Sequence, residues 1–263
     1  MLPVFFKIGL FEVRSFGVMM LIAFLCALWL ALRRAEKYGF TKAQVMDAAF
    51  WVLLAGILGA RLGFILQELP DFLKHPDKLF TLKFEGLTSF GGVIFGFFAL
   101  WLYSRKLGRG VTGILDVMAA PFLVGHIFGR IGCLLNGCCY GGPVHSNVPW
   151  AIHVNVLNEN PATLHHPAQI YDSLMNVGGL ILLLLLERKP RAPGQSFGLM
   201  LVFYGMARII YEMWRAGASS TYWGSLPFTQ AQAMAALLVL VGLAMFFIQG
   251  YRFKPIEVRT ESP

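Results

Sequence analysis

Charged residues are scarce in this chain. Of its 263 residues, 14% are Asp, Glu, Lys or Arg and 57% are hydrophobic, and the mean hydropathy is +0.63. A soluble domain carries about 25% charged residues, so this composition excludes a soluble globular protein. Charge is missing altogether from residues 15–32 and 86–104. Each run is about as long as a ~30 Å hydrocarbon core requires, so the chain is predicted to be an integral membrane protein.

Apolar windows predict an all-α integral membrane protein with seven transmembrane helices in a single domain, residues 1–263. Most positive residues near the first window follow it, the opposite of a cleavable signal peptide, so this helix is expected to stay in the mature protein. The helices are expected at about 14–33, 44–67, 86–104, 112–136, 169–187, 195–214 and 229–249, with an outer loop at 137–168.

Lys and Arg are absent from residues 137–168, and acids outnumber lysines in residues 68–85. The loops after the first, third and fifth helices and the C-terminal tail each hold three or four Lys or Arg residues. By the positive-inside rule these segments face the cytoplasm, so the N-terminus is predicted outside and the C-terminus inside. Topology and anionic lipid headgroups thus account for the net charge of +8, and no nucleic-acid partner is expected.

Three helices predicted to run outward from the cytoplasm each carry an arginine. Arg61, Arg130 and Arg208 all reach the outer half of the bilayer at 1.5 Å per residue. A single arginine near a helix end often extends its side chain to the headgroups. Because three arginines recur at one depth, we expect them to converge on one layer.

Carboxylates are too few in these three helices to balance the arginines. Asp47 and Asp116 lie at the cytoplasmic starts of their helices, where a carboxylate complements a helix N-terminus. Glu212 is the one acid in the outer half, and its spacing from Arg208 predicts an internal ion pair. Arg61 and Arg130 are therefore expected to lack a protein counter-ion.

An anionic ligand at the outer leaflet would supply the missing negative charge. The guanidinium group binds phosphate through two parallel hydrogen bonds, and phospholipid is the phosphate-bearing molecule of a bilayer. A lone histidine at a helix end is more often structural, yet several polar residues accompany these arginines. They are His126, Asn136, His166, Gln169, Tyr171 and Tyr204.

Glycine pairs at GxxxG spacing occur in three of the predicted helices. They are Gly59–Gly63, Gly92–Gly96 and Gly125–Gly129, and this spacing lets helix backbones approach closely. We attribute all three pairs to helix packing.

Cysteine is rare, with four residues, but three of them fall together as Cys133, Cys138 and Cys139. The spacing CxxxxCC lacks the paired CxxC or HxxxH pattern of strong zinc sites. Small buried thiols are favoured over a disulfide or a metal site, and a covalent acceptor role stays open. No metal and no cofactor are expected.

Four segments occur in a recognisable order: GRIGCLLNGCCYG (129–141), HHPAQIYDS (165–173), YGMARIIYEMWR (204–215) and FTQAQ (228–232). With the seven-helix topology, the chain resembles the bacterial phosphatidylglycerol–prolipoprotein diacylglyceryl transferases over nearly its whole length. The resemblance implies transfer of the diacylglyceryl group of phosphatidylglycerol to the thiol of the lipobox cysteine behind a prolipoprotein signal peptide. A thioether forms and glycerol phosphate leaves. It also implies a multi-pass protein of the bacterial cytoplasmic membrane, in contact with membrane lipids, with its site facing the outer leaflet.

The resemblance also implies roles for individual residues. Arg130 and Arg208 match arginines of the family motifs and are implied to hold the headgroup and the leaving phosphate. Arg61 matches an arginine of the second helix. The other residues implied to bind substrate are Asn136, Gly141, Gln169, Tyr171, Tyr204, Glu212, Gly91 and Gly92, and His166 falls in the same motif as Gln169.

The chain departs from the family pattern at several positions. The motif usually reads GRxGNFxNGExxG, and Cys133, Leu134 and Cys138 replace its Asn, Phe and Glu. Phe90 stands where well-studied members have a histidine, and Phe16 where they have a tyrosine.

Two alternatives follow from these departures. The chain is either a divergent transferase that takes its proton acceptor from His126 or His166, or a paralogue that kept the lipid site and changed its reaction. The intact arginines favour the first alternative. The rival class is a transporter, flippase or lipid-binding protein for an anionic lipid, but an odd helix number and a one-sided set of arginines favour an enzyme over it.

Overall fold

The computed structural model describes residues 2, 4–8, 11–69, 89–144, 148–154, 163–189, 191–215, 222 and 228–253. The chain divides into two compact units. One comprises residues 1–31 and 115–263, and the other residues 32–114. That the chain forms one transmembrane domain stays a prediction.

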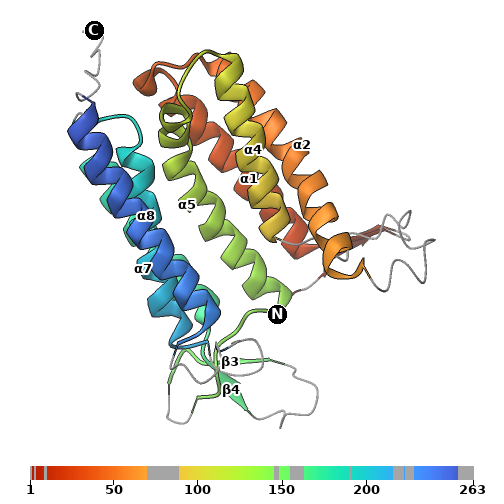
Figure 1. The fold of residues 1–263 in the computed structure, drawn as a ribbon. Coiled ribbons are helices and arrows are strands. Elements are labelled where there is room, and N and C mark those ends of the chain that lie inside the picture. The colour runs from red at the N-terminus through yellow and green to blue at the C-terminus, as the bar shows by residue number, and fades with distance from the viewer. Residues whose placement is uncertain are drawn as a thin grey trace, which may run out of the picture. The chain divides into compact units, whose positions relative to one another are not determined.

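The described part of the chain contains seven α-helices, which Figure 1 shows as coiled ribbons. Each begins and ends within about three residues of its predicted range, because a long apolar run with charged residues at its ends indicates both the presence and the limits of a helix. They are α1 (Ser15–Arg34), α2 (Lys42–Gln67), α4 (Ser89–Lys106), α5 (Val111–Asn136), α6 (Ala168–Leu186), α7 (Gln195–Glu212) and α8 (Gln230–Arg252).

Five of these helices, namely α1, α2, α5, α6 and α8, are long and apolar enough to cross a membrane. α4 and α7, with 18 residues each, fall outside this set among the described residues. The helical architecture is thus confirmed, whereas seven membrane crossings and the orientation of the termini stay predictions.

The expectation of a purely α-helical chain needs a small correction. β1 (Val4–Ile8) pairs antiparallel with β2 (Phe11–Arg14) directly before α1. β3 (Ile152–His153) pairs with β4 (Leu164–His165) inside the predicted outer loop, and a 3-10 turn, η1 (Glu36–Tyr38), precedes α2. Such short elements leave no periodic pattern in a sequence.

The core of the unit formed by residues 1–31 and 115–263 lies between α5, α6 and α7. Small side chains let α5 approach its neighbours, and α7 and α8 meet through glycine. A Cβ on Gly198 would lie 2.7 Å from the Gly242 carbonyl oxygen, so these two backbones are in direct contact. The fully buried core side chains are Ala119, Ala120, Leu123, Leu183 and Met200.

Asp116 fixes the start of α7. Its carboxylate accepts hydrogen bonds from the backbone N–H of Gly194 at 2.6 Å and of Phe197 at 2.8 Å. Asp116 does bind the N-terminus of a helix, as predicted. That helix is α7, however, and not α5, to which Asp116 belongs. Asp47, the other predicted cap, accepts a hydrogen bond from the Tyr103 hydroxyl at 3.4 Å, while Thr41 caps α2.

Glycines join α2 and α4 in the unit formed by residues 32–114. A Cβ on Gly91 would lie 2.1 Å from the Gly59 carbonyl oxygen, and one on Gly92 3.3 Å from the Gly56 carbonyl oxygen. The packing role predicted for the glycines of these two helices is confirmed. It is wrong for Gly125 of α5, where a Cβ would meet no described atom within 4 Å.

Gly91→Ala is expected to destabilise the protein by about 1–3 kcal/mol, because the new methyl group meets backbone atoms that cannot rotate away. Thermal unfolding of the purified full-length protein in detergent, without lipid substrate, measures this loss. Gly56→Ala is the matched control, since its Cβ would find its nearest neighbour at an ordinary 3.8 Å. Equal stability of the two variants would contradict the packing assignment.

Candidate functional site

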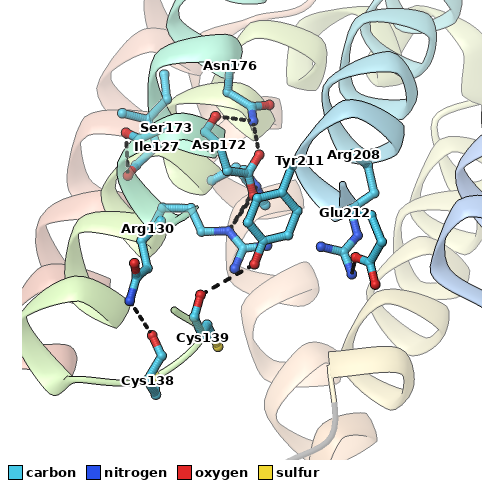
Figure 2. A network of polar contacts seen from close by, with 12 residues as sticks. Ile127, Arg130, Cys138, Cys139, Asp172, Ser173, Asn176, Arg208, Tyr211 and Glu212 are labelled. Carbon is cyan, nitrogen blue, oxygen red and sulfur yellow. Dashed lines mark hydrogen bonds and ion pairs between the residues drawn. The ribbon is translucent and has the colours of Figure 1, made fainter. Parts of the chain in front are cut away.

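A buried ion pair joins α5 to α6. The Nε of Arg130 lies 2.6 Å from Oδ2 of Asp172 (Figure 2). The Nε2 of His126 lies 3.2 Å from the same oxygen. Asp172 is 1% exposed, and its Oδ1 accepts a hydrogen bond from Nδ2 of Asn176 at 2.7 Å. His126 and Arg130 are four residues apart, so they share one face of α5.

The expectation that Arg130 lacks a protein counter-ion is therefore wrong. The carboxylate partner comes from α6 and not from one of the three helices that carry arginine, so a balance of charges within those helices does not include it. A sequence signal was present, because Asp172 and Asn176 are polar residues four apart on one face of a largely apolar helix. Arg61 belongs to residues 32–114, where its guanidinium lies 5.8 Å from the Phe64 ring centroid. Its convergence with Arg130 stays a prediction.

The predicted pair on α7 is confirmed. Nη2 of Arg208 lies 3.1 Å from Oε2 of Glu212, and the Glu212 side chain is 1% exposed. The Nη1 of Arg208 is also buried, and among the described residues it has no hydrogen-bond partner. Leaving a charged donor buried without an acceptor is costly, so this nitrogen points to an acceptor supplied by a ligand.

Tyr211 connects the two ion pairs. Its ring centroid lies 4.9 Å from Cζ of Arg130 and 4.9 Å from Cζ of Arg208, and the residue is fully buried (Figure 2). Cation–π attraction at this range holds both guanidinium groups against one ring. Sequence reasoning missed Tyr211, although it lies three residues after Arg208 in the quoted motif. Tyr204 instead packs edge-on against His126, with ring centroids 5.1 Å apart.

The loop after α5 is tied to the start of α6. The Gly141 N–H donates to the His166 carbonyl at 2.8 Å, and a Cβ on Gly141 would lie 2.7 Å from the Trp214 carbonyl oxygen. Only glycine fits there. The Nδ1 of His166 lies 3.2 Å from the Tyr171 hydroxyl, which also accepts a hydrogen bond from Nε1 of Trp150 at 2.7 Å.

The three clustered cysteines lie at the same end of α5. The sulfur atoms of Cys133, Cys138 and Cys139 are all within 4.8 Å of one another, and all three thiols are free. Hydrogen bonds from the other two thiols and the positive charges of Arg130 and Arg215 lower the pKa of the Cys139 thiol. The sequence favoured small buried thiols over a disulfide or a metal site, and the structure has three free thiols that are half-buried and lie in one cluster.

The other residues predicted to bind substrate range from fully buried to exposed. Gln169 is fully buried and donates from Nε2 to the Cys138 carbonyl at 2.7 Å. Asn136 is exposed at the last position of α5. Gly91 and Gly92 lie in α4 and face α2, so helix packing accounts for both glycines. The side chain of Phe90 and residues 70–88 lie outside the described residues.

The model of the prolipoprotein diacylglyceryl transferase family matches residues 3–248. The chain belongs to this family. It is similar to the phosphatidylglycerol–prolipoprotein diacylglyceryl transferase of Vibrio vulnificus, with 36% identity over 92% of this chain and 89% of the relative. The enzymes of the same name from Pseudomonas fluorescens and Clostridium tetani are 30% and 28% identical, over 97% and 96% of this chain and over 96% and 99% of those proteins.

Asp172→Asn is expected to destabilise this family member by about 3–5 kcal/mol, because it leaves the buried Arg130 cation without its counter-ion. The amide keeps the shape of the side chain, so the change isolates the charge. Thermal unfolding in detergent measures the effect. The same substitution at the exposed Asp47 serves as control and should change the stability by no more than about 0.5 kcal/mol. Similar losses at both sites would contradict the role given to the ion pair.

Proposed function

We propose that this protein transfers the diacylglyceryl group of phosphatidylglycerol to the lipobox cysteine thiol of prolipoproteins, the first step of lipoprotein maturation. The observation that carries the proposal is the buried pair of arginines on Tyr211, one of which has an unpartnered Nη1. We further propose seven membrane spans in the bacterial cytoplasmic membrane, with the N-terminus outside, the C-terminus cytoplasmic and the site open to the outer leaflet.

The arginines fit a phosphodiester headgroup that gains charge as it leaves. Asp172 contacts Arg130 through Nε, so this pair does not occupy the Nη1 and Nη2 edge of the guanidinium fork. Arg208 adds its buried Nη1. Each arginine is already neutralised by an acid, so the lipid with its single negative charge is bound moderately. The second charge that develops as the carbon–oxygen bond breaks is stabilised by donors already in place, which lowers the barrier.

The two candidate histidines take different roles. The Nε2 of His126 faces Asp172 at 3.2 Å and Nε of Arg130 at 3.4 Å, so His126 is a positioning residue for the arginine. His166 contacts Tyr171 through Nδ1, which leaves its Nε2 for the substrate. His166 is therefore the better candidate to accept the proton of the attacking thiol.

The other predicted substrate contacts remain part of the proposal. The Oε1 of Gln169 is buried without a hydrogen-bond partner among the described residues and suits a headgroup hydroxyl of phosphatidylglycerol. Tyr171 and Gly141 shape the loop beside it, and Tyr204 and Glu212 hold His126 and Arg208. Additional contacts to lipid or signal peptide are proposed for Asn136 and Arg61, whereas Gly91 and Gly92 are left to the packing of α4 on α2.

Arg130→Ala and Arg208→Ala are each expected to lower transfer at least about 100-fold, because each removes donors aimed at the leaving phosphate. The assay uses purified full-length protein, radiolabelled phosphatidylglycerol and a lipobox peptide. Arg252→Ala, at the exposed end of α8, is the matched control and should keep full activity. Full transfer activity of both Arg130→Ala and Arg208→Ala, at normal stability, would contradict the proposal. Arginine-dependent lipid binding without transfer by the wild type would identify a lipid-binding paralogue.

The histidine roles are separated by kinetics. His126→Gln is expected to raise KM for phosphatidylglycerol more than it lowers kcat, because it disturbs the arginine that binds the headgroup. His166→Gln is expected to lower kcat about 100-fold with little change in KM, as loss of a proton acceptor does. Steady-state kinetics with varied lipid and saturating peptide give both constants, and a reversed pattern would exchange the two roles.

A further inference from the structure

The three clustered thiols have no task in the transfer described so far. Cys133 is in the last turn of α5, three residues after Arg130, and Cys138 and Cys139 are in the turn that follows. Their spacing in the sequence, CxxxxCC, contains none of the paired motifs that are typical of zinc ligands. The backbone nevertheless brings all three within 4.8 Å of one another.

The turn that gathers the thiols is held from several sides. Gly137 has φ of 76° and Cys139 has φ of 62°, and Cys139 is the one non-glycine residue with positive φ in the described part of the chain. Such a conformation persists where its surroundings enforce it. The Cys138 N–H donates to the Cys133 carbonyl at 3.1 Å, and Gln169 donates to the Cys138 carbonyl. Tyr211 donates to the Cys139 carbonyl (Figure 2).

We propose that Cys133, Cys138 and Cys139 bind a zinc ion whose fourth position takes the thiol of the substrate cysteine. The inference rests on the proposed function. Thiolates are soft donors that select ions such as Zn²⁺. Zinc–sulfur bonds of about 2.3 Å in a tetrahedral site place sulfur atoms about 3.8 Å apart, so the cluster needs to contract by about 1 Å at most. Three protein ligands and one open position are the pattern of catalytic zinc sites.

The position of the ion suits the reaction. Arg130 lies one helical turn before Cys133, and its guanidinium stacks on Tyr211, which donates a hydrogen bond to the Cys139 carbonyl. The zinc-bound thiol is thereby placed beside the arginines that hold the phosphate, as attack on the lipid requires. Zinc with three thiolates carries one negative charge, and the charges of Arg130 and Arg215 act on this cluster.

The proposed reaction is an alkylation of the substrate sulfur by the glyceryl carbon of the lipid. The substrate thiol binds zinc and loses its proton, since a metal-bound thiol is deprotonated, and His166 or water takes that proton. The sulfur then attacks the glyceryl carbon, a carbon–sulfur bond forms, and the carbon–oxygen bond breaks with its electron pair on the phosphate. Glycerol phosphate takes up one proton, and the neutral thioether leaves the zinc ion.

Metal content of the purified full-length protein tests the site directly. Elemental analysis of protein from zinc-supplemented cells is expected to give about one zinc ion per chain. Cys133→Ser, Cys138→Ser and Cys139→Ser should each lower it to about one tenth or less, while Cys26→Ser, the fourth cysteine, should leave it unchanged. Thermal unfolding and Arg208-dependent lipid binding identify variants that are folded.

Cobalt substitution tests the open position. Co²⁺ in place of zinc should produce thiolate-to-cobalt charge-transfer absorption that is lost in Cys138→Ser. Adding a lipobox peptide should intensify and shift this absorption, whereas the same peptide with serine in place of cysteine should leave it unchanged. An unchanged spectrum with the cysteine peptide would overturn the assigned role of the ion.

The remaining outcomes separate this inference from the proposed function. Metal-free wild-type protein with full transfer, whether its thiols are free or joined in a disulfide, overturns the zinc site and leaves the transferase intact. Zinc loading that is the same in all four cysteine variants also overturns the site. A zinc-loaded protein that binds the cysteine peptide at the metal and transfers nothing supports the site and overturns the proposed reaction.

Discussion

The ion pair between Arg130 and Asp172 is the constraint on which the site depends. A charged side chain inside an apolar helix bundle is tolerated only with a partner, and here the partner comes from the neighbouring helix. The 2.6 Å contact fixes α5 against α6, while Asn176 and His126 hold the same carboxylate. The geometry of the guanidinium is therefore set before any lipid arrives.

In the proposed function, a second neutralised arginine on the same tyrosine completes the site for the phosphate. Tyr211 lies against both Arg130 and Arg208, and Glu212 balances the latter. Because the two pairs are neutral overall, the site discriminates by hydrogen-bond geometry more than by total charge. In the proposed reaction, these fixed donors favour the doubly charged leaving phosphate over the phosphodiester, and such differential stabilisation accelerates a reaction.

Much of the fold was predictable from the sequence, because long apolar runs bounded by charge define helices whatever their packing. The pair of Arg208 with Glu212 was predictable for a similar reason, since both lie on one helix. The partner of Arg130 was not, because Asp172 meets it only through the packing of α5 on α6. The gathering of Cys133 with Cys138 and Cys139 depends on two left-handed residues in a turn, which the spacing of cysteines does not encode. Local rules thus predicted the elements, and contacts between elements decided the site.

The proposed function requires the two buried arginines to receive the phosphate of phosphatidylglycerol. An experimental structure of the full-length protein with this lipid bound tests it most directly. The account predicts a phosphate oxygen at about 2.7–2.9 Å from Nη1 of Arg208, with the Arg130 guanidinium on the same phosphate and the contact to Asp172 preserved. A lipid phosphate bound elsewhere, with Arg208 still paired only to Glu212, would contradict the account.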